Sequence, residues 1–237
     1  ENGVSTPETL NDFELGWRLK KEHVKINTNI YYMDYKNQLV LTGALDDVGQ
    51  PIRATSGSSY RLGLEIDADI RLSNKFNWRP NAAFSSNKNR DFFITRDGNN
   101  VPQSLGTTDI SFSPDVVLGN IITYLPLENL QFSFLSKYVG KQFMSNFSSA
   151  ISNNDVLESF FTSDINIVYE IKPKKIFKSI TFTALVNNIF DKEYVDRGYY
   201  FTFDDTWSTP GVTTTVDGAG YYPQATRNFL LGATFRF

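Results

Sequence analysis

The sequence predicts an all-β fold, an antiparallel up-and-down barrel whose strands cross a lipid bilayer. Three observations support this fold class: apolar and polar residues alternate over long stretches, ionised residues keep to one side of these stretches, and short and long connections alternate along the chain. A length of 237 residues suits a single all-β domain. Because no apolar run reaches the roughly 18 residues that a spanning helix needs, strands would have to cross the membrane.

Strict alternation is clearest in the segment YRLGLEIDADIRL at residues 60–72. A period of two gives a strand one apolar and one polar face. Most of the alternating stretches reach the roughly 9 to 11 residues of a tilted transmembrane strand. The nine predicted strands lie at about 11–20, 24–34, 59–72, 76–86, 114–124, 130–140, 160–171, 179–190 and 227–237.

The apolar face of the strand cores carries no charged residue, although Asp34 lies just past one core. A Lys or Arg on a lipid-facing position near the bilayer midplane costs about 2 to 4 kcal/mol, so the apolar face is predicted to meet lipid. The polar face carries Asp12, Glu14, Arg18, Lys20, Lys25, Arg61, Glu65, Asp67, Asp69, Arg71, Arg79, Asp115, Lys137, Asp164, Glu170 and Arg236. Five of these are predicted to face the lumen, where they pair with each other or contact protein inside the barrel: Arg18, Arg61, Glu65, Asp67 and Arg71.

The connections between predicted strands alternate in length. Short turns are predicted at 21–22, 73–75, 126–129 and 172–178, and long connections at 35–58, 87–113, 141–159 and 191–226. Short turns at one rim and long loops at the other are typical of outer-membrane barrels, in which the long loops face the cell exterior.

Several classes of site are excluded or disfavoured by composition. The chain has no cysteine and one histidine, so thiolate nucleophiles, disulfides and His-rich metal sites cannot form. With 23 basic and 26 acidic residues, the chain has no excess of positive charge that would attract nucleic acid. His23 lies at a predicted short turn, away from the rim where a catalytic base would be needed, and the acidic pairs Asp46/Asp47 and Asp204/Asp205 lack the spacing of a calcium loop. We therefore predict no enzyme activity, no bound metal and no cofactor.

Aromatic residues of the longest predicted loop are the candidate ligand contacts. Exposed amphipathic rings are common at binding surfaces. The candidates are Tyr199, Tyr200, Trp207, Tyr221 and Tyr222. The alternative role for these rings is an upper aromatic girdle or packing within the loop.

Five segments resemble, in order, parts of the barrel of TonB-dependent outer-membrane receptors. They are TPETLNDFELGWRLK (6–20), SGSSYRLGLEIDADIRL (56–72), YVGKQF (138–143), LVNNIFDKEYVDRGY (185–199) and YYPQATRNFLLGATFRF (221–237). The resemblance implies a barrel of about 22 strands around a lumen filled by an N-terminal plug. Residues 1–237 would be its C-terminal nine strands, with the plug and the earlier strands absent.

The resemblance also implies a function. The expected activity is uptake of a scarce nutrient, such as an iron chelate (siderophore complex), cobalamin or a similar compound, across the outer membrane of a Gram-negative bacterium and energised by TonB. The expected partners are outer-membrane lipid, the protein's own plug, TonB, the barrel-assembly machinery and an extracellular small molecule, with no nucleic acid among them.

The last strand resembles the C-terminal signal by which such barrels are recognised for insertion. Gly232, Phe235 and Phe237 match it, whereas Leu230 stands where a polar residue is usual. The alternative is an ordinary core strand at a C-terminus.

The sequence is also compatible with three other classes of protein. A soluble up-and-down barrel that binds a small apolar ligand would place its apolar faces inside. A passive porin would share the wall but lack a plug. A membrane-barrel enzyme would need a nucleophile and a base near the outer rim.

Overall fold

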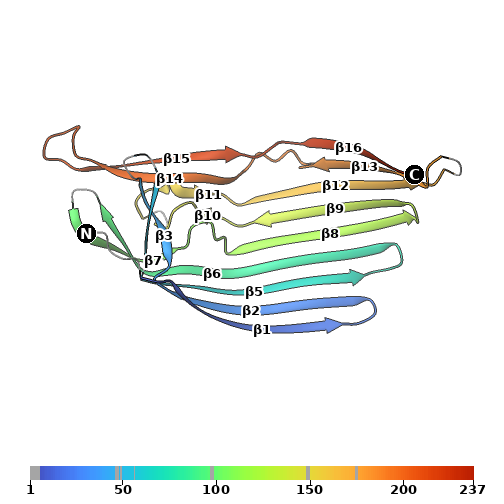
Figure 1. The fold of residues 1–237 in the computed structure, drawn as a ribbon, viewed down its shortest axis with the longest axis horizontal. Helices are drawn as coiled ribbons and strands as arrows, with labels where there is room; N and C mark the ends of the chain where they lie inside the picture. Colours follow the sequence, from blue (N-terminus) through green and yellow to red (C-terminus); the bar gives the residue numbers. More distant parts are fainter. Residues whose placement is uncertain are drawn as a thin grey trace.

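In a computed structural model, the chain forms one large curved antiparallel sheet, with its long connections gathered at one end and its short turns at the other (Figure 1). We call these the loop end and the turn end. The structure describes residues 6–45, 48, 50–55, 57–96, 99–147, 150–173 and 176–237. Among these residues, no helix is long and apolar enough to span a membrane.

The sheet follows the order β1-β2-β5-β6-β8-β9-β12-β13-β16, and each strand pairs antiparallel with the next. These strands correspond to the predicted ranges, although β6 continues far into a predicted loop. Their bounds are β1 Thr9–Lys20, β2 Val24–Lys36, β5 Ser58–Arg71, β6 Phe76–Arg96, β8 Val116–Leu127, β9 Leu130–Val139, β12 Phe160–Ile171, β13 Ser179–Asn187 and β16 Asn228–Arg236.

The predicted count of nine strands is not confirmed for the chain, because the long connections fold into strands of their own. β3 pairs with β4, β7 with the end of β6, β10 with β11, and β14 with β15. These segments were predicted as irregular loops because they are rich in Gly, Asn, Asp and Thr. The additional elements are β3 Leu39–Leu45, β4 Pro51–Thr55, β7 Asn99–Asp109, β10 Gln142–Phe143, the 3-10 helix η1 Asn153–Asp155, β11 Val156–Leu157, β14 Val195–Asp205 and β15 Thr214–Pro223.

The strand register keeps apolar and polar positions on opposite faces across the sheet. Leu15, Ile30, Leu64 and Phe84 are direct cross-strand partners in turn. Arg18 begins a parallel row on the other face that continues through Asn27, Asp67 and Asn81. A slip of one residue in any pairing would have mixed the two rows.

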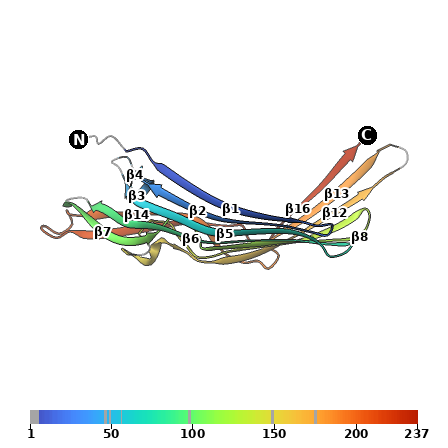
Figure 2. The same cartoon turned by 90° about the horizontal axis from the view of Figure 1, so that it is seen from below.

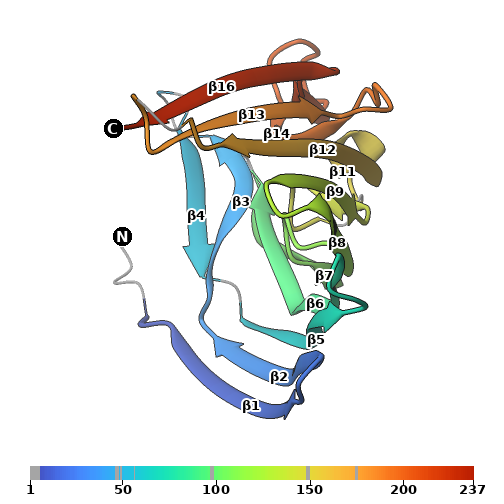
Figure 3. The ribbon, with the colours of Figure 1, turned by 90° about the vertical axis from the view of Figure 1, so that its right-hand side faces the viewer.

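The ionised face is the concave one. The sheet curves strongly (Figure 2), and the β3–β4 hairpin projects inside this curve (Figure 3). Ser59 of β5, on the same face as Arg61 and Glu65, donates a hydrogen bond of 2.5 Å to Gln38, just before β3. The convex face is therefore the apolar one.

Large apolar side chains of the convex face lie open to the surroundings of the chain. Leu15 is 72% exposed on β1 and Leu231 is 79% exposed on β16, at opposite edges of the sheet. Soluble proteins rarely expose contiguous apolar surface of this extent, so the convex face needs an apolar cover such as lipid.

The exposed apolar side chains of the convex face form a band, and polar and aromatic groups lie at both of its margins. Toward the loop end, Arg90 pairs with Asp34 at 3.0 Å, donates to the Tyr32 hydroxyl at 2.7 Å and lies 4.8 Å from the centre of the Tyr60 ring. Toward the turn end, Phe76 stacks on Tyr124 with ring centroids 4.4 Å apart. Aromatic girdles at such limits are characteristic of membrane barrels.

Candidate functional site

The long connections pack against one another as a single layer at the loop end. Its buried centre combines side chains from four separate connections, so no connection is an independent loop. The core comprises Val40 from β3, Phe92 and Ile94 from β6, and Phe147, packed by Leu105, Ile151 and Tyr200. The ring of Phe147 lies 6.1 Å from the rings of both Phe92 and Tyr200.

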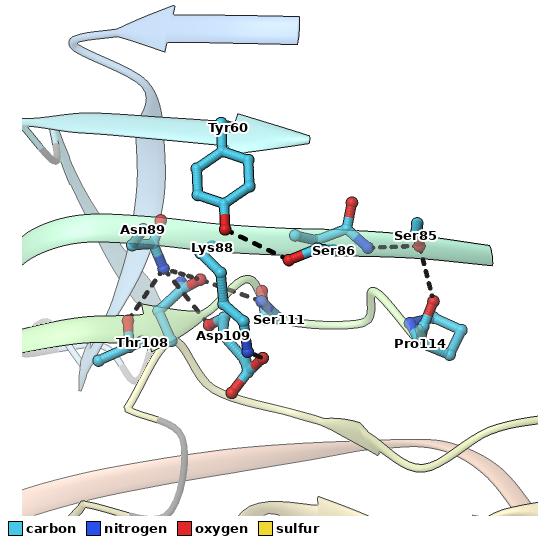
Figure 4. A network of polar contacts seen from close by, with 11 residues as sticks. Tyr60, Ser85, Ser86, Lys88, Asn89, Thr108, Asp109, Ser111 and Pro114 are labelled. Carbon is cyan, nitrogen blue, oxygen red and sulfur yellow. Dashed lines mark hydrogen bonds and ion pairs between the residues drawn. The ribbon is translucent and has the colours of Figure 1, made fainter. Parts of the chain in front are cut away.

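A buried polar network fixes this layer to the sheet (Figure 4). The fully buried Asn89 of β6 donates from Nδ2 to Thr108 Oγ1 at 3.1 Å and to Asn146 Oδ1 at 3.3 Å. Asn146 Oδ1 also accepts from the Ser111 backbone N–H at 3.0 Å. On the other face of β6, Lys88 forms an ion pair with Asp109. The network thus holds β7 and the segment around Asn146 to β6.

One face of the β14–β15 hairpin carries a row of aromatic rings. Tyr199 lies 6.2 Å from Tyr222 and 6.4 Å from Phe201, while Phe203 and Trp207 stack almost in parallel at 5.9 Å. The opposite strand contributes glycines beneath two of these rings: a Cβ at Gly220 would overlap the ring of Tyr199, and one at Gly218 would overlap that of Phe201. Aromatic rings that cover cross-strand glycines lie flat on a sheet.

The other face of the hairpin turns toward neighbouring loops. Tyr200 joins the buried apolar cluster, and the Tyr221 hydroxyl donates to the Asn154 carbonyl at 2.7 Å. Asn154 Nδ2 also donates to Asp217 at 2.9 Å. The five aromatic candidates are therefore divided. Tyr199, Trp207 and Tyr222 lie on the exposed face or tip, whereas Tyr200 and Tyr221 lie on the face that contacts the neighbouring loops.

The acidic pair Asp204/Asp205 is used locally. Asp204 is buried and accepts a hydrogen bond from Thr215 Oγ1 at 2.8 Å. Asp205 accepts from the backbone N–H groups of Trp207 and Ser208 at 3.0 Å, and hydrogen bonds from Ser208 and Trp207 hold the pKa of the Asp205 carboxyl below its usual value. The pair thus shapes the hairpin tip. Asp46 and Asp47 lie outside the described residues.

A cavity of about 450 Å³ lies beside the hairpin. Of the residues that line it, the sequence had indicated only Tyr221 as a candidate ligand contact. Its wall consists of Asn153, residues 156–159, residues 192–195 and Tyr221. Tyr194 stacks on Phe160, with ring centroids 4.4 Å apart, and Phe160 belongs to the concave face of β12. Burial, and then the negative charges of Asp196 and Asp164, raise the pKa of the Tyr194 hydroxyl. No period-two pattern marks the segments that form this wall.

Comparison with known proteins decides the family. The model of the family described as TonB dependent receptor-like, β-barrel, matches residues 3–189. The chain belongs to this family. No curated protein sequence matches the chain.

Solved structures of a siderophore receptor, a ferric-catecholate import receptor and a copper transporter share the fold of the chain. The siderophore receptor PiuA from Acinetobacter baumannii aligns with a TM-score of 0.68 at 18% identity, over 94% of this chain and 28% of its own. The ferric-catecholate import receptor Fiu from E. coli K12, in its closed form, gives 0.64 at 17%, over 98% and 28%. The copper transporter OprC gives 0.65 at 16%, over 100% and 33%. The chain thus spans a third or less of these proteins.

The predicted lumen-facing residues lie on the concave face of this TonB-dependent receptor barrel segment. Arg61 donates to Ser113 Oγ at 2.9 Å, and Asp67 accepts from Asn27 Nδ2 at 2.8 Å. Within the described ranges, no ion pair joins any two of Arg18, Arg61, Glu65, Asp67 and Arg71. Neutral partners therefore engage Arg61 and Asp67.

Of the residues of the predicted insertion signal, Gly232 and Phe235 lie in β16, and Phe237 follows the end of this strand. Phe235 and Phe237 both contact Phe177, with ring centroids 5.4 and 5.0 Å apart. A Cβ at Gly232 would come within 2.6 Å of Thr183 Oγ1, so β13 and β16 approach closely there. The three residues thus combine a tight strand contact with an aromatic cluster at the edge of the apolar band.

Proposed function

We propose that the chain is the C-terminal part of the barrel of a TonB-energised nutrient transporter in the outer membrane of a Gram-negative bacterium. The family match and the limited share of each solved relative that the chain spans support a role as one part of a longer protein. β1 and β16 stand at the two ends of the sheet order, and open edges are costly in lipid. Further strands of the same barrel would pair with both edges.

The division between the two faces of the sheet carries this proposal. The convex face is apolar and exposed, while Arg61, Glu65 and Asp67 lie on the concave face. A soluble barrel built to hold an apolar ligand would have the opposite arrangement. The observed arrangement suits lipid outside and a plug or water inside.

In this proposal the loop end captures a scarce nutrient, such as an iron chelate, cobalamin or a similar compound. The packed loop layer supplies a firm base, and the exposed rings of Tyr199, Trp207 and Tyr222 supply contact surface. The plug and TonB would act through other segments of the protein, and the barrel-assembly machinery would read the end of β16, including Gly232, Phe235 and Phe237. Transport rather than catalysis is the proposed role.

The test measures uptake by the full-length protein. Cells that depend on it under nutrient limitation are supplied with labelled ferric chelates or cobalamin, with TonB present or deleted. We expect saturable uptake that requires TonB. Uptake that is linear in concentration and independent of TonB would favour a passive porin instead.

A further inference from the structure

We propose that the cavity between residues 156–159 and 192–195 binds a small organic cation through the carboxylates of Glu158 and Glu193 and the rings of Tyr194 and Tyr221. The inference deepens the proposed function, on which it rests, because it names the chemistry of a ligand group taken up at the loop end. The expected group is an ammonium, free or alkylated.

The cavity has the size and position of a ligand site. Its volume of about 450 Å³ falls within the roughly 300 to 1,000 Å³ of small-molecule pockets. Two long connections form it, one leading through η1 and β11 into β12 and the other leading from β13 into β14. The stacking of Tyr194 on Phe160 sets it at the loop-end margin of the concave face.

The walls of the cavity are held in place by hydrogen bonds that do not use the carboxylates of Glu158 and Glu193. Asn188 is buried; its side chain accepts from the Lys192 N–H at 2.9 Å and donates to the Lys192 carbonyl at 2.8 Å. The Asn188 N–H donates to Asp164 at 2.7 Å. On the opposite side, the bond from Tyr221 to the Asn154 carbonyl fixes the tyrosine ring. The backbone at Lys192 and the ring of Tyr221 are therefore held in place before any ligand arrives, which lowers the entropic cost of binding.

The charge of the lining favours a cation. The lining contains two carboxylates, Glu158 and Glu193, and a single basic residue, Lys192. In the part of the chain that the structure describes, no hydrogen bond or ion pair engages these three side chains. Asp196 and Asp164 lie close enough to act on the Tyr194 hydroxyl, and Arg197 is paired with Asp196 at 3.2 Å. An anionic chelate would meet net repulsion here.

The aromatic residues add a second attraction for the same class of ligand. The face of a tyrosine ring carries negative electrostatic potential and attracts ammonium groups within about 6 Å of its centre. The rings and the carboxylates of the lining therefore both favour a cation over a neutral molecule of equal shape, which the rings would bind by apolar contact alone.

The experiment compares choline with its neutral isostere 3,3-dimethylbutan-1-ol, using the full-length receptor purified in detergent and ligand-observed NMR titrations. We expect choline to bind about tenfold more tightly, as a partly desolvated cation–π contact with nearby carboxylates would give. The double variant Glu158→Gln/Glu193→Gln should reduce choline affinity toward that of the isostere, with the rings retaining a part of the preference, whereas Lys192→Gln should increase choline affinity.

A matched control is Glu128→Gln, which removes an exposed carboxylate at the turn end. Equal affinity for both probes, an unchanged choline affinity in the double variant, or an equal loss in Glu128→Gln would overturn the proposal. Uptake assays distinguish failure of the cation site from failure of the proposed function. TonB-dependent uptake without choline binding would contradict only the cation site. Choline binding without TonB-dependent uptake would contradict only the transport role.

Discussion

At the scale of single residues, Asp91 shows how one backbone conformation brings distant side chains together. It has a φ of 52°, and the register between β6 and β7 shifts between Asn89 and Phe92. With this irregularity, Asn89 contacts Asn146 while Phe92 packs on Phe147. Asp is one of the few residue types that adopt this left-handed conformation readily. The sequence carries no pattern from which such a bulge could be inferred.

Replacement of Asn89 tests whether the buried network holds the loop layer together. Asn89→Ala should destabilise the layer by about 1 to 3 kcal/mol, because it removes the hydrogen bonds that the buried Asn89 side chain donates to Thr108 Oγ1 and to Asn146 Oδ1. Hydrogen exchange should become faster at the Ser111 amide and around Asn146. Asn74→Ala, in an exposed turn, is the control and should leave these rates unchanged. Equal exchange in both variants would show that the network does not stabilise the layer.

Gly63 offers a second test at this scale, within the sheet itself. A Cβ at Gly63 would overlap the ring of its cross-strand partner Tyr31, whereas nothing lies within 4 Å of a Cβ at Gly57. Gly63→Ala should therefore cost about 1 to 3 kcal/mol through overpacking. Gly57→Ala should be close to neutral. The readout is the temperature at which the folded protein loses its compact form on gels, and equal temperatures for the two variants would contradict the expectation.

At the scale of elements, the strands of the wall were predictable and the strands of the loop layer were not. A lipid-facing position excludes charge, so alternation is strict in segments such as 60–72. The β14–β15 hairpin has polar and aromatic residues on both faces, so it lacks this alternation and its sequence resembled that of a loop. Once Tyr199 and Tyr200 are known to share a strand, their opposite faces follow from the period of two, and so do those of Tyr221 and Tyr222. No sequence pattern predicted the cavity between two connections, because its wall consists of short segments that are separated in the sequence.

The tip of this hairpin should respond to acid. The pKa of Asp205 is lowered in the folded state by hydrogen bonds from Ser208 and Trp207, so its contribution is fully present above the ordinary carboxyl pKa of about 3.9 and is lost as pH falls through the lowered value. Trp207 fluorescence, isolated by subtraction of a Trp207→Phe variant, should be constant from pH 7 to about pH 5 and change below. Asp205→Asn should remove this acid transition. A transition that persists in Asp205→Asn would assign it to another group.

At the scale of the whole molecule, the curvature of the sheet matches the separation of its charged residues from its apolar ones. Nine strands in one path give a wall with Arg61, Glu65 and Asp67 toward its concave side and large apolar residues toward its convex side. Family membership agrees with this wall, yet neither fixes the ligand, because the wall is general to the fold. In our proposals the ligand is contacted by groups of the loop layer, namely Glu158, Glu193 and the exposed hairpin rings.

Two neighbouring residues on opposite faces test the membrane orientation directly. Leu64 lies on the convex face and Glu65 on the concave face of β5. In the full-length protein folded into lipid vesicles, Leu64→Arg should cost about 2 to 4 kcal/mol, because it places a cation in hydrocarbon near the middle of the strand. Glu65→Arg should cost much less, since its side chain stays on the polar side. The measurement is the free energy of unfolding in denaturant. Equal losses would mean that the convex face does not meet lipid at this depth, and a larger loss for Glu65→Arg would place lipid on the concave side.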